Sequence, residues 1–239
     1  MFTRLSLSVA TAVALAAALS GCGTISDAVA DATASASPSP SPTEAREGRV
    51  LTSPEAKSAL PVLTDLTGSG WKPGTPTADD DQPSVTPAEC APLVTATSAD
   101  FPDYKSKLAV REEVTFTNES SGYTDLNFEV ASWTNAADSA LPIDASALID
   151  KCTSTITGTY ADGTVQTITA KRLTPLPLGD KQVAMQFYAT NSGVTVYLSV
   201  FEATFGHNLI TAVQTSTSSE DPQKTFEPVI NGIIADLSA

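Results

Sequence analysis

Apolar and polar residues alternate through most of the second half of the chain. This pattern, with its β-branched and aromatic residues, predicts half-buried strands. Six runs show it: 107–117, 123–134, 164–173, 181–190, 193–205 and 208–217. The breaks between neighbouring runs are short and turn-like, such as "NESSG", "PLPLGD", "NSG" and "GH". Because a parallel crossover needs about a dozen residues or more, these strands are expected to pair antiparallel.

Helices are expected before, between and after the strands. Ser53, Pro54 and Glu55 form a helix start, with Ser53 as the N-cap hydroxyl, proline at the first helical position and then an acid at the positive end of the helix dipole. The leucines that follow have helical spacing, so the helix is expected to continue, kinked at Pro61, until Gly68. Residues 221–238 carry a single apolar stripe at helical spacing, which predicts an amphipathic helix that covers a sheet face.

Two further helices are predicted around cysteines. Thr86 to Glu89 resembles a capping box, which places Cys90 in the first turn of a short helix. The apolar spacing in residues 143–156 predicts another helix that brings Cys152 to the core. The predicted fold is α+β, a single domain with a roughly six-stranded antiparallel sheet flanked by helices.

The first 21 residues have the features of a secretory signal. Arg4 supplies a positive charge and Leu5–Leu19 is apolar, a run shorter than the roughly 20 residues that span a bilayer. Leu19-Ser20-Gly21-Cys22 resembles a bacterial lipobox. Cleavage before Cys22 would place an acylated cysteine at the mature N-terminus. Two or three acyl chains give stable anchoring, so we expect the protein to be lipid-anchored on the extracytoplasmic face of the cell membrane.

Residues 22–48 are predicted to be a disordered Ala/Ser/Pro linker, because they hold too few large apolar side chains to offset the entropy of ordering. The Ser-Pro repeats favour an extended spacer of about 3.1 Å per residue. Residues 49–239 have the size of one domain. The formal net charge is −14, which argues against a nucleic-acid partner.

The remaining cysteines are expected to pair. If Cys22 carries lipid, the exported domain keeps Cys90 and Cys152, and a lone pair outside the cytoplasm is expected to form a disulfide. Closing a loop of about 60 residues would stabilise the fold by roughly 4 kcal/mol in the chain-entropy model. A metal site or catalytic thiol would need nearby histidines, and His207 is the only histidine in the chain.

With these elements in place, the chain resembles the PknH-like extracellular sensor domain family of a mycobacterial kinase and of actinobacterial lipoproteins. The resemblance covers nearly all of residues 49–239. It rests on "ALPVLTDLTGSGW", "PAECAPL", "FEVASW", the Cys152 helix and "FGHNLITAV". It implies an α+β fold with a cleft beside the sheet and a non-enzymatic domain that binds an envelope ligand. Unlike the kinase, the chain shows neither a kinase nor a transmembrane segment, and its domain has only two cysteines.

No nucleophile–base pair, metal-binding motif or phosphate-binding loop stands out, and no cofactor or metal is expected. Trp71, Trp133 and His207 are the candidate ligand contacts, although each also fits a structural role, the tryptophans as core anchors and His207 as a turn residue. Asp79–Asp81 lack the spacing of a calcium loop and are expected to be solvated.

Three functions stay open. The first is a tethered module that binds an apolar or amphipathic envelope molecule or a peptide. The second is a structural protein that docks on another envelope protein. The third is a hydrolase that uses a carboxylate pair, since Glu112, Glu113, Glu129 and Glu202 lie on predicted strands and could face one another. Aromatic residues make up only 6% of the chain, so a sugar-sized catalytic groove is disfavoured and binding is preferred.

Overall fold

The computed structural model describes residues 48–75, 83–95, 106–120, 123–140, 146–152, 155–191, 193–218 and 221–238. The predicted signal peptide, almost all of the predicted linker, and Asp79–Asp81 lie outside these residues. Among the described residues, no helix is long and apolar enough to cross a membrane.

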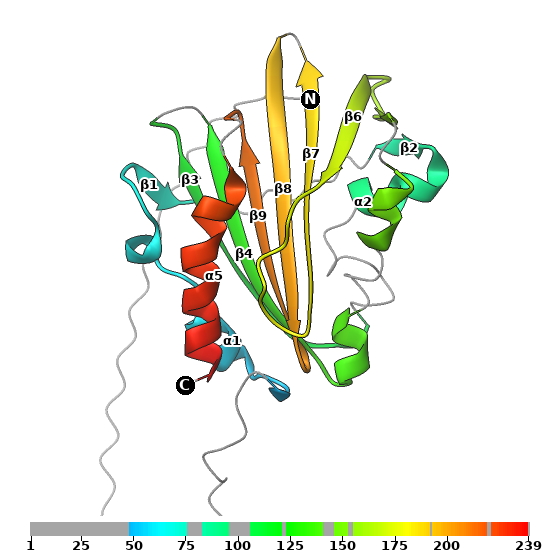
Figure 1. The fold of residues 1–239 in the computed structure, drawn as a ribbon. Coiled ribbons are helices and arrows are strands. Elements are labelled where there is room, and N and C mark those ends of the chain that lie inside the picture. Colours follow the sequence, from blue (N-terminus) through cyan, green and yellow to red (C-terminus); the bar gives the residue numbers. More distant parts are fainter. Residues whose placement is uncertain are drawn as a thin grey trace, which may run out of the picture. The chain divides into compact units, whose positions relative to one another are not determined.

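One antiparallel sheet forms the centre of the domain (Figure 1). In spatial order its strands are β1 (Trp71–Pro73), β3 (Leu108–Asn118), β4 (Thr124–Trp133), β9 (Asn208–Ser216), β8 (Val194–Phe205), β7 (Lys181–Asn191), β6 (Val165–Arg172), β5 (Ile156–Thr159) and β2 (Ser84–Thr86). Each neighbouring pair is antiparallel. The last strand of the chain therefore lies at the centre, between β4 and β8.

The sheet has nine strands, so the prediction of six was wrong in number. The six predicted runs correspond to β3, β4, β6, β7, β8 and β9, which confirms the antiparallel α+β class. The additional strands β1, β2 and β5 are only three or four residues long. Segments this short carry too little alternation to be recognised, and they become strands because they pair with the free edges of β3 and β6 and, for β2, with β5.

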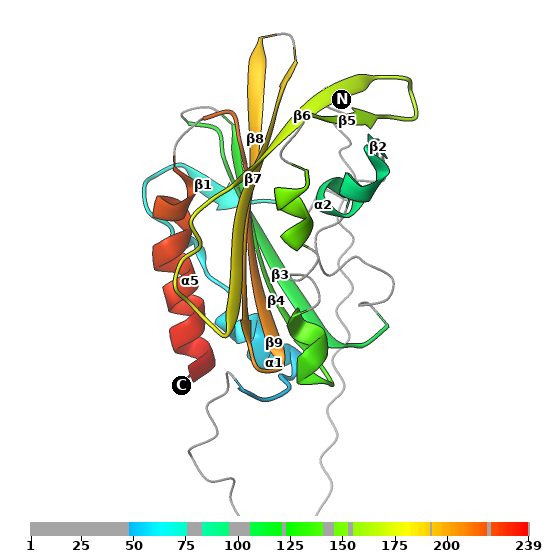
Figure 2. The ribbon, with the colours of Figure 1, turned by 45° about the vertical axis from the view of Figure 1, so that its right-hand side comes forward.

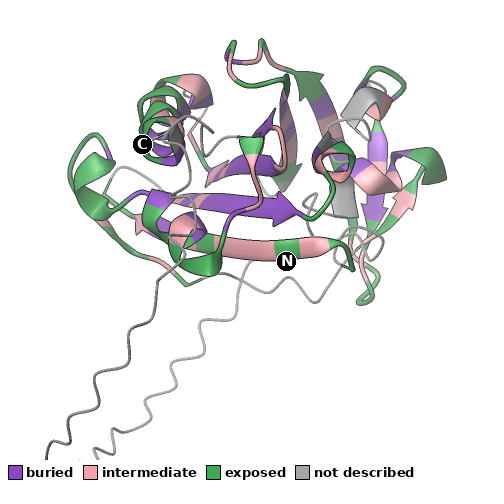
Figure 3. Cartoon of the chain, turned by 90° about the horizontal axis from the view of Figure 1, so that it is seen from below, coloured by how far each residue is buried: buried purple, intermediate pink, exposed green. Residues whose placement is uncertain are grey.

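Helix α5 (Pro222–Ser238) covers one face of the sheet, here called the α5 face. Its stripe packs into a cluster whose strand members include Phe128, Phe201 and Ile210. Phe226 is 1% exposed and meets Phe128 edge to face, with ring centroids 6.4 Å apart. In Figure 3 the outer side of α5 is exposed while the central strands are largely buried. Each such buried side chain contributes roughly 1.5–3 kcal/mol, so the predicted amphipathic helix is a main source of stability.

The opposite face, here called the disulfide face, is covered by short elements (Figure 2). These are η3 (Ala88–Cys90), α2 (Ala91–Thr95) and η6 (Ser146–Asp150), and η5 (Ala136–Ala140) contacts the ends of β4 and β9. Leu93 and Ile149 pack with Trp133, Met185 and Phe187 of the strands. This second cluster is therefore held by residues that come from many separate segments.

A β-bulge shows how the two faces are kept distinct. Leu108 and Val110 would share a face in a regular strand, because side chains two apart point the same way. The register between β3 and β4 shifts between these residues. As a result Leu108 packs in the second cluster opposite Trp133, whereas Val110 packs against the first.

Helix α1 (Ser53–Ala59) begins one residue earlier than predicted, because Thr52 and not Ser53 is its N-cap, and it also ends earlier. The Thr52 backbone N–H donates to Glu55 Oε2 over 2.9 Å, which closes a capping box. Leu60 is extended, with ψ 144°, because a residue before proline is disfavoured in the helical region. Pro61 therefore ends the helix instead of kinking it. After the break, η2 (Leu63–Asp65) forms a single 3₁₀ turn.

The predicted helix at Thr86 also differs. Thr86 is the last residue of β2, and a cis Thr86–Pro87 peptide bond separates it from η3. Cys90 ends η3, immediately before α2 begins. The predicted helix around Cys152 is reduced, in the described part, to the 3₁₀ helix η6, and Cys152 lies just beyond it.

Candidate functional site

Cys90 and Cys152 form the predicted disulfide. Their Cα atoms are 5.8 Å apart, and both residues are fully buried in the second cluster. The bond joins the end of η3 to the residue that follows η6, so it ties together two of the short elements on the disulfide face. This face therefore depends on a covalent link where the α5 face depends on one long helix.

The structure brings Trp133 and His207 together but not Trp71. Trp133 is fully buried at the end of β4, and its backbone N–H donates to the His207 carbonyl over 2.9 Å. His207 lies in the β8–β9 turn, with Nδ1 2.9 Å from the Trp133 carbonyl oxygen. Trp71 lies on edge strand β1, packs against the first cluster and donates from Nε1 to the Thr67 carbonyl. The three predicted contacts are thus divided between the two faces.

The strand glutamates are sorted by the sheet register. Glu113 pairs with Glu129, Glu129 pairs with Thr211, and Thr211 pairs with Glu202. Paired residues in antiparallel strands point to the same side, so these four, here called the glutamate row, all lie on the disulfide face. Glu112 points the other way and accepts a hydrogen bond from Ser53 of α1.

The centre of the glutamate row is buried. Glu129, Thr211 and Glu202 are 3%, 2% and 2% exposed. Strand spacing places the Cα atoms of the two glutamates roughly 10 Å apart, with Thr211 between them. Burying carboxylates is costly unless they are paired and hydrogen-bonded. The row therefore needs a physical reason beyond the packing of a sheet.

Arg111 supplies part of that compensation. Its Nε and Nη2 atoms both lie 2.8 Å from Glu129 Oε2, and Nη2 is 3.6 Å from a Glu113 oxygen. Arg111 is two residues from Glu113 on the same strand face, so the alternation of β3 itself places the guanidinium beside the row. Sequence reasoning identified the glutamates but missed Arg111 and Thr211. The phase of the alternation in β3 and β9, compared with that of Glu129, was the available signal.

Two neutral polar groups on this face are buried without a hydrogen bond. Thr211 Oγ1 and Trp133 Nε1 have no hydrogen-bond partner in the structure. Most buried polar groups in proteins are hydrogen-bonded, and a lone buried donor or acceptor costs about 1–3 kcal/mol. The hydroxyl lies between two carboxylates and the indole lies farther along β4 on the same face. These groups leave hydrogen-bonding capacity that the described residues do not use.

The chemistry of the face is therefore mixed. Its β5, β6 and β7 half is apolar, with Ile168, Met185 and Phe187 in the second cluster. Its β3, β4, β9 and β8 half carries the glutamate row. Among the described residues there is no group of three or more histidine, cysteine or acidic side chains that could hold a metal ion. The arrangement places hydrogen-bond acceptors beside a buried apolar cluster.

Comparison with known proteins supports the fold. No protein-family model matches the chain, and no curated protein matches it. The extracellular domain of PknH from Mycobacterium tuberculosis is similar in structure, with a TM-score of 0.59 and 10% sequence identity over 79% of this chain and 97% of that domain. A putative uncharacterised protein from Mycobacterium smegmatis has a TM-score of 0.46 and 14% identity, over 81% of this chain and 98% of its own. The chain thus resembles the PknH extracellular sensor domain in fold.

Proposed function

We propose that the protein is a membrane-tethered extracytoplasmic lipoprotein that binds an envelope ligand on the disulfide face and does not catalyse a reaction. The observation that carries the proposal is the buried Thr211 hydroxyl, unpartnered and set between Glu129 and Glu202. A buried hydroxyl without a partner lowers the stability of the fold. Destabilising groups of this kind are commonly found at binding sites.

The ligand class follows from the two halves of the face. A polar head that donates hydrogen bonds would meet the glutamate row, and the Trp133 indole would donate to an acceptor on the same head. An apolar part would lie toward Met185 and Phe187. An amphipathic envelope molecule or a peptide with these features fits. The similarity to PknH adds an analogy, since that domain is the extracellular part of its protein.

A direct test is native mass spectrometry of the full protein purified from its own host. We expect a co-purified mass that is retained in the parent and lost in Thr211→Val. Thr204→Val is the matched control, because Thr204 is equally buried on the same face but its Oγ1 already accepts from the Lys181 backbone N–H. A ligand that remains in Thr211→Val would contradict the proposed site.

The same preparations test the two alternatives. A docking protein would carry no small molecule in either the parent or the variants. A hydrolase would turn over a glycan or ester, and Glu129→Gln or Glu202→Gln would abolish that activity with folding intact. Either result would replace the binding proposal.

The tether is tested separately by Cys22→Ala. Because the lipobox cysteine is the proposed acylation site, the variant should leave the membrane fraction while keeping a folded domain with its disulfide. Fractionation with a high-salt wash measures this. Recovery of the variant wholly with membranes would rule out the lipid anchor.

A further inference from the structure

Beyond the apolar rows of the α5 face, the surface of β7, β8 and β9 becomes polar. Two successive rows of paired residues form this surface, here called the tyrosine–glutamine patch. The first row is Gln186, Ser199 and Gln214, and the second is Tyr188, Tyr197 and Ser216. The row on the other side is Ala184, Phe201 and Ala212, which belongs to the first cluster. The patch therefore begins where the core of this face ends.

Of the segments that cover the α5 face, the ring of Phe226 and the start of the β6–β7 connection lie at the level of that core row. Phe226 of α5 contacts Phe128, whose partner on β9 is Ala212. The β6–β7 connection begins at Leu173, whose N–H donates to the Ala184 carbonyl over 2.9 Å. Figure 1 shows β7 and β8 projecting beyond the end of α5. The two tyrosines and Gln186 are part-exposed, whereas Ser199, Gln214 and Ser216 are buried, so the accessible part of the patch is the tyrosine pair with Gln186.

The patch combines an aromatic platform with two unused amide atoms. The rings of Tyr188 and Tyr197 lie side by side across β7 and β8, with centroids 6.0 Å apart and planes inclined by 37°. Gln214 is 7% exposed, and its Oε1 has no hydrogen-bond partner in the structure. Gln223, in the first turn of α5, has a buried Nε2 that is also without one.

The helix geometry brings Gln223 to the edge of the patch. It precedes Phe226 by three residues, so it lies on the same side of α5 and about one turn nearer the patch. Gln214 lies one side-chain step beyond Ala212 on β9. An acceptor and a donor without partners therefore flank one end of the tyrosine platform. Other polar groups of the patch are satisfied internally, such as Gln186 Nε2, which donates to Ser199 Oγ over 3.0 Å.

The lack of charge in the patch limits the class of ligand that it can bind. None of its six side chains is charged, although the chain carries a formal −14, and the charged residue paired with its edge is the exposed Lys171. An anionic polymer would be repelled by the acidic protein, and none of the six side chains is a carboxylate that would bind a cation. Tyrosine rings offer an apolar face with a polar rim. A neutral polyhydroxyl chain can lay its C–H faces on the rings and exchange hydrogen bonds with the two amides.

We propose that the tyrosine–glutamine patch is a binding site for an uncharged glycan. This site is on the opposite face from the glutamate row and is independent of the ligand proposed there. For a protein tethered outside the membrane, it would hold the domain against a neutral polysaccharide of the envelope.

The test uses the full-length protein and a panel of neutral oligosaccharides of four to six sugars with gluco, manno, galacto and arabino configurations. Uronic acid oligosaccharides of the same length serve as the charged comparison. Titration by NMR should show saturable binding of at least one neutral member and none of the uronates. Tyr188→Ala, Tyr197→Ala and Gln214→Leu should each weaken that binding by roughly tenfold or more.

Three controls separate recognition from folding. Tyr188→Phe and Tyr197→Phe keep the platform and should retain binding. Tyr123→Ala removes a more exposed tyrosine outside the patch and should leave binding unchanged. Gln214→Leu should not lower the melting temperature, since the amide oxygen it removes has no partner.

Several results would overturn the proposal. They are the absence of saturable binding by every neutral member up to about 10 mM, equal binding of the uronates, and binding that survives the double Tyr188→Ala/Tyr197→Ala change. Thr211→Val distinguishes the two proposals, because it should remove the co-purified ligand without altering glycan binding.

Discussion

The two faces of the sheet are covered by different kinds of structural element. The α5 face is covered mainly by one 17-residue helix, whose apolar stripe follows the apolar rows of the central strands, together with α1 and Leu176 of the β6–β7 connection. The disulfide face is covered by short helical segments, two of which are tied together by Cys90–Cys152, and it buries the centre of the glutamate row. The α5 face is dominated by one long apolar helix, whereas the disulfide face is covered by short segments and retains buried charge.

The difference separates an apolar face from a face that buries charged and unpartnered polar groups. An apolar interface gives stability and little specificity, and the middle rows of the α5 face, between Ser132 and Asn208 at one end and the tyrosine–glutamine patch at the other, are apolar on β4, β8 and β9. The disulfide face contains Arg111, Glu129 and Glu202 in positions where apolar residues would be cheaper to bury. The binding function proposed above would account for their retention.

The largest effect is expected from opening the α5 face. Phe226→Ala removes a fully buried ring that contacts Phe128 and should lower the free energy of unfolding by about 3–5 kcal/mol. Chemical denaturation measures the loss. Phe226→Leu, which refills most of the volume, should recover most of it. A loss below about 1 kcal/mol in Phe226→Ala would show that α5 is not the main support of the fold.

Removing the disulfide should come next. The double change Cys90→Ala/Cys152→Ala releases a link across 62 residues and should cost about 2–4 kcal/mol. Hydrogen exchange should rise first in η3, α2 and η6, while α5 stays protected. If α5 loses protection at the same time, the two faces unfold as one unit and the contrast between them fails.

A substitution in the glutamate row should have a smaller effect on the free energy of unfolding, and of opposite sign. In ligand-free protein, Thr211→Val removes a buried hydroxyl without a partner and should raise the free energy of unfolding by about 1 kcal/mol. Thr204→Val removes an acceptor that the Lys181 N–H uses and should lower it by a similar amount. Thermal unfolding of both variants gives the comparison. A destabilised Thr211→Val would show that the hydroxyl is already bonded in the protein.

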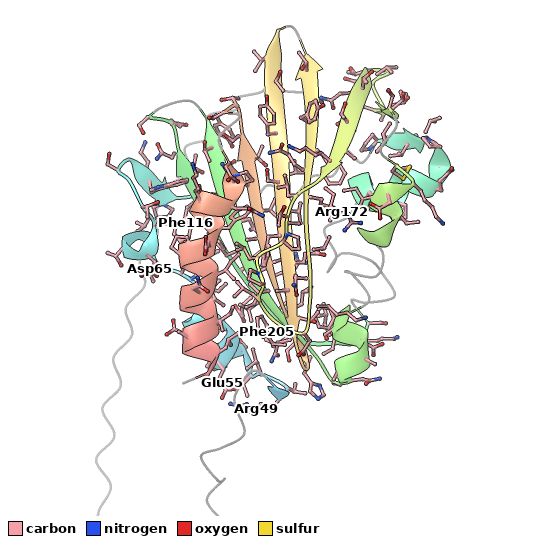
Figure 4. All side chains as sticks on the ribbon, in the orientation of Figure 1. Arg49, Glu55, Asp65, Phe116, Arg172 and Phe205 are labelled. Carbon is pink, nitrogen blue, oxygen red and sulfur yellow. A yellow bond between two sulfur atoms is a disulfide. The ribbon has the colours of Figure 1, made fainter. Side chains whose placement is uncertain are left out.

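The smallest effect is a pH dependence at the start of α1, on the α5 face. Hydrogen bonds from Arg49 and Thr52 lower the pKa of Glu55 from 4.5 to about 2, and Figure 4 shows Arg49 beside Glu55. Because the folded-state pKa is depressed, the stabilisation is present above pH 4.5 and is lost as the pH falls toward 2.

The pair is partly exposed, with Arg49 and Glu55 side chains 37% and 25% accessible, so the gain should be about 1 kcal/mol or less. The stability difference between the parent and Glu55→Gln should shrink between pH 6 and pH 3. Arg49→Gln should show the same trend more weakly, since Thr52 still bonds the carboxylate. A difference that stays constant with pH would show that the carboxylate charge is not what stabilises the helix start.

The sequence by itself determined the long elements and their class. Period-two alternation in β3, β4 and β6–β9 and the stripe of α5 are local signals, and short turns require antiparallel pairing. The disulfide could also be predicted, because only Cys90 and Cys152 remain to pair if Cys22 carries lipid. In the same way the alternation showed that Glu129 and Glu202 lie on strands.

Only the tertiary structure decided which residues meet. The order of strands places β9 between β4 and β8, and this alone puts Thr211 between two glutamates from distant parts of the chain. The bulge at Leu108 and the edge pairing of β1, β2 and β5 likewise depend on partners that a local pattern does not contain. Nothing in the sequence distinguished Trp71 from Trp133 as ligand contacts. In the structure they pack in different clusters, on opposite faces of the sheet. Periodicity fixes the side on which a residue points, whereas its neighbours are set by long-range register and by the burial that follows from it.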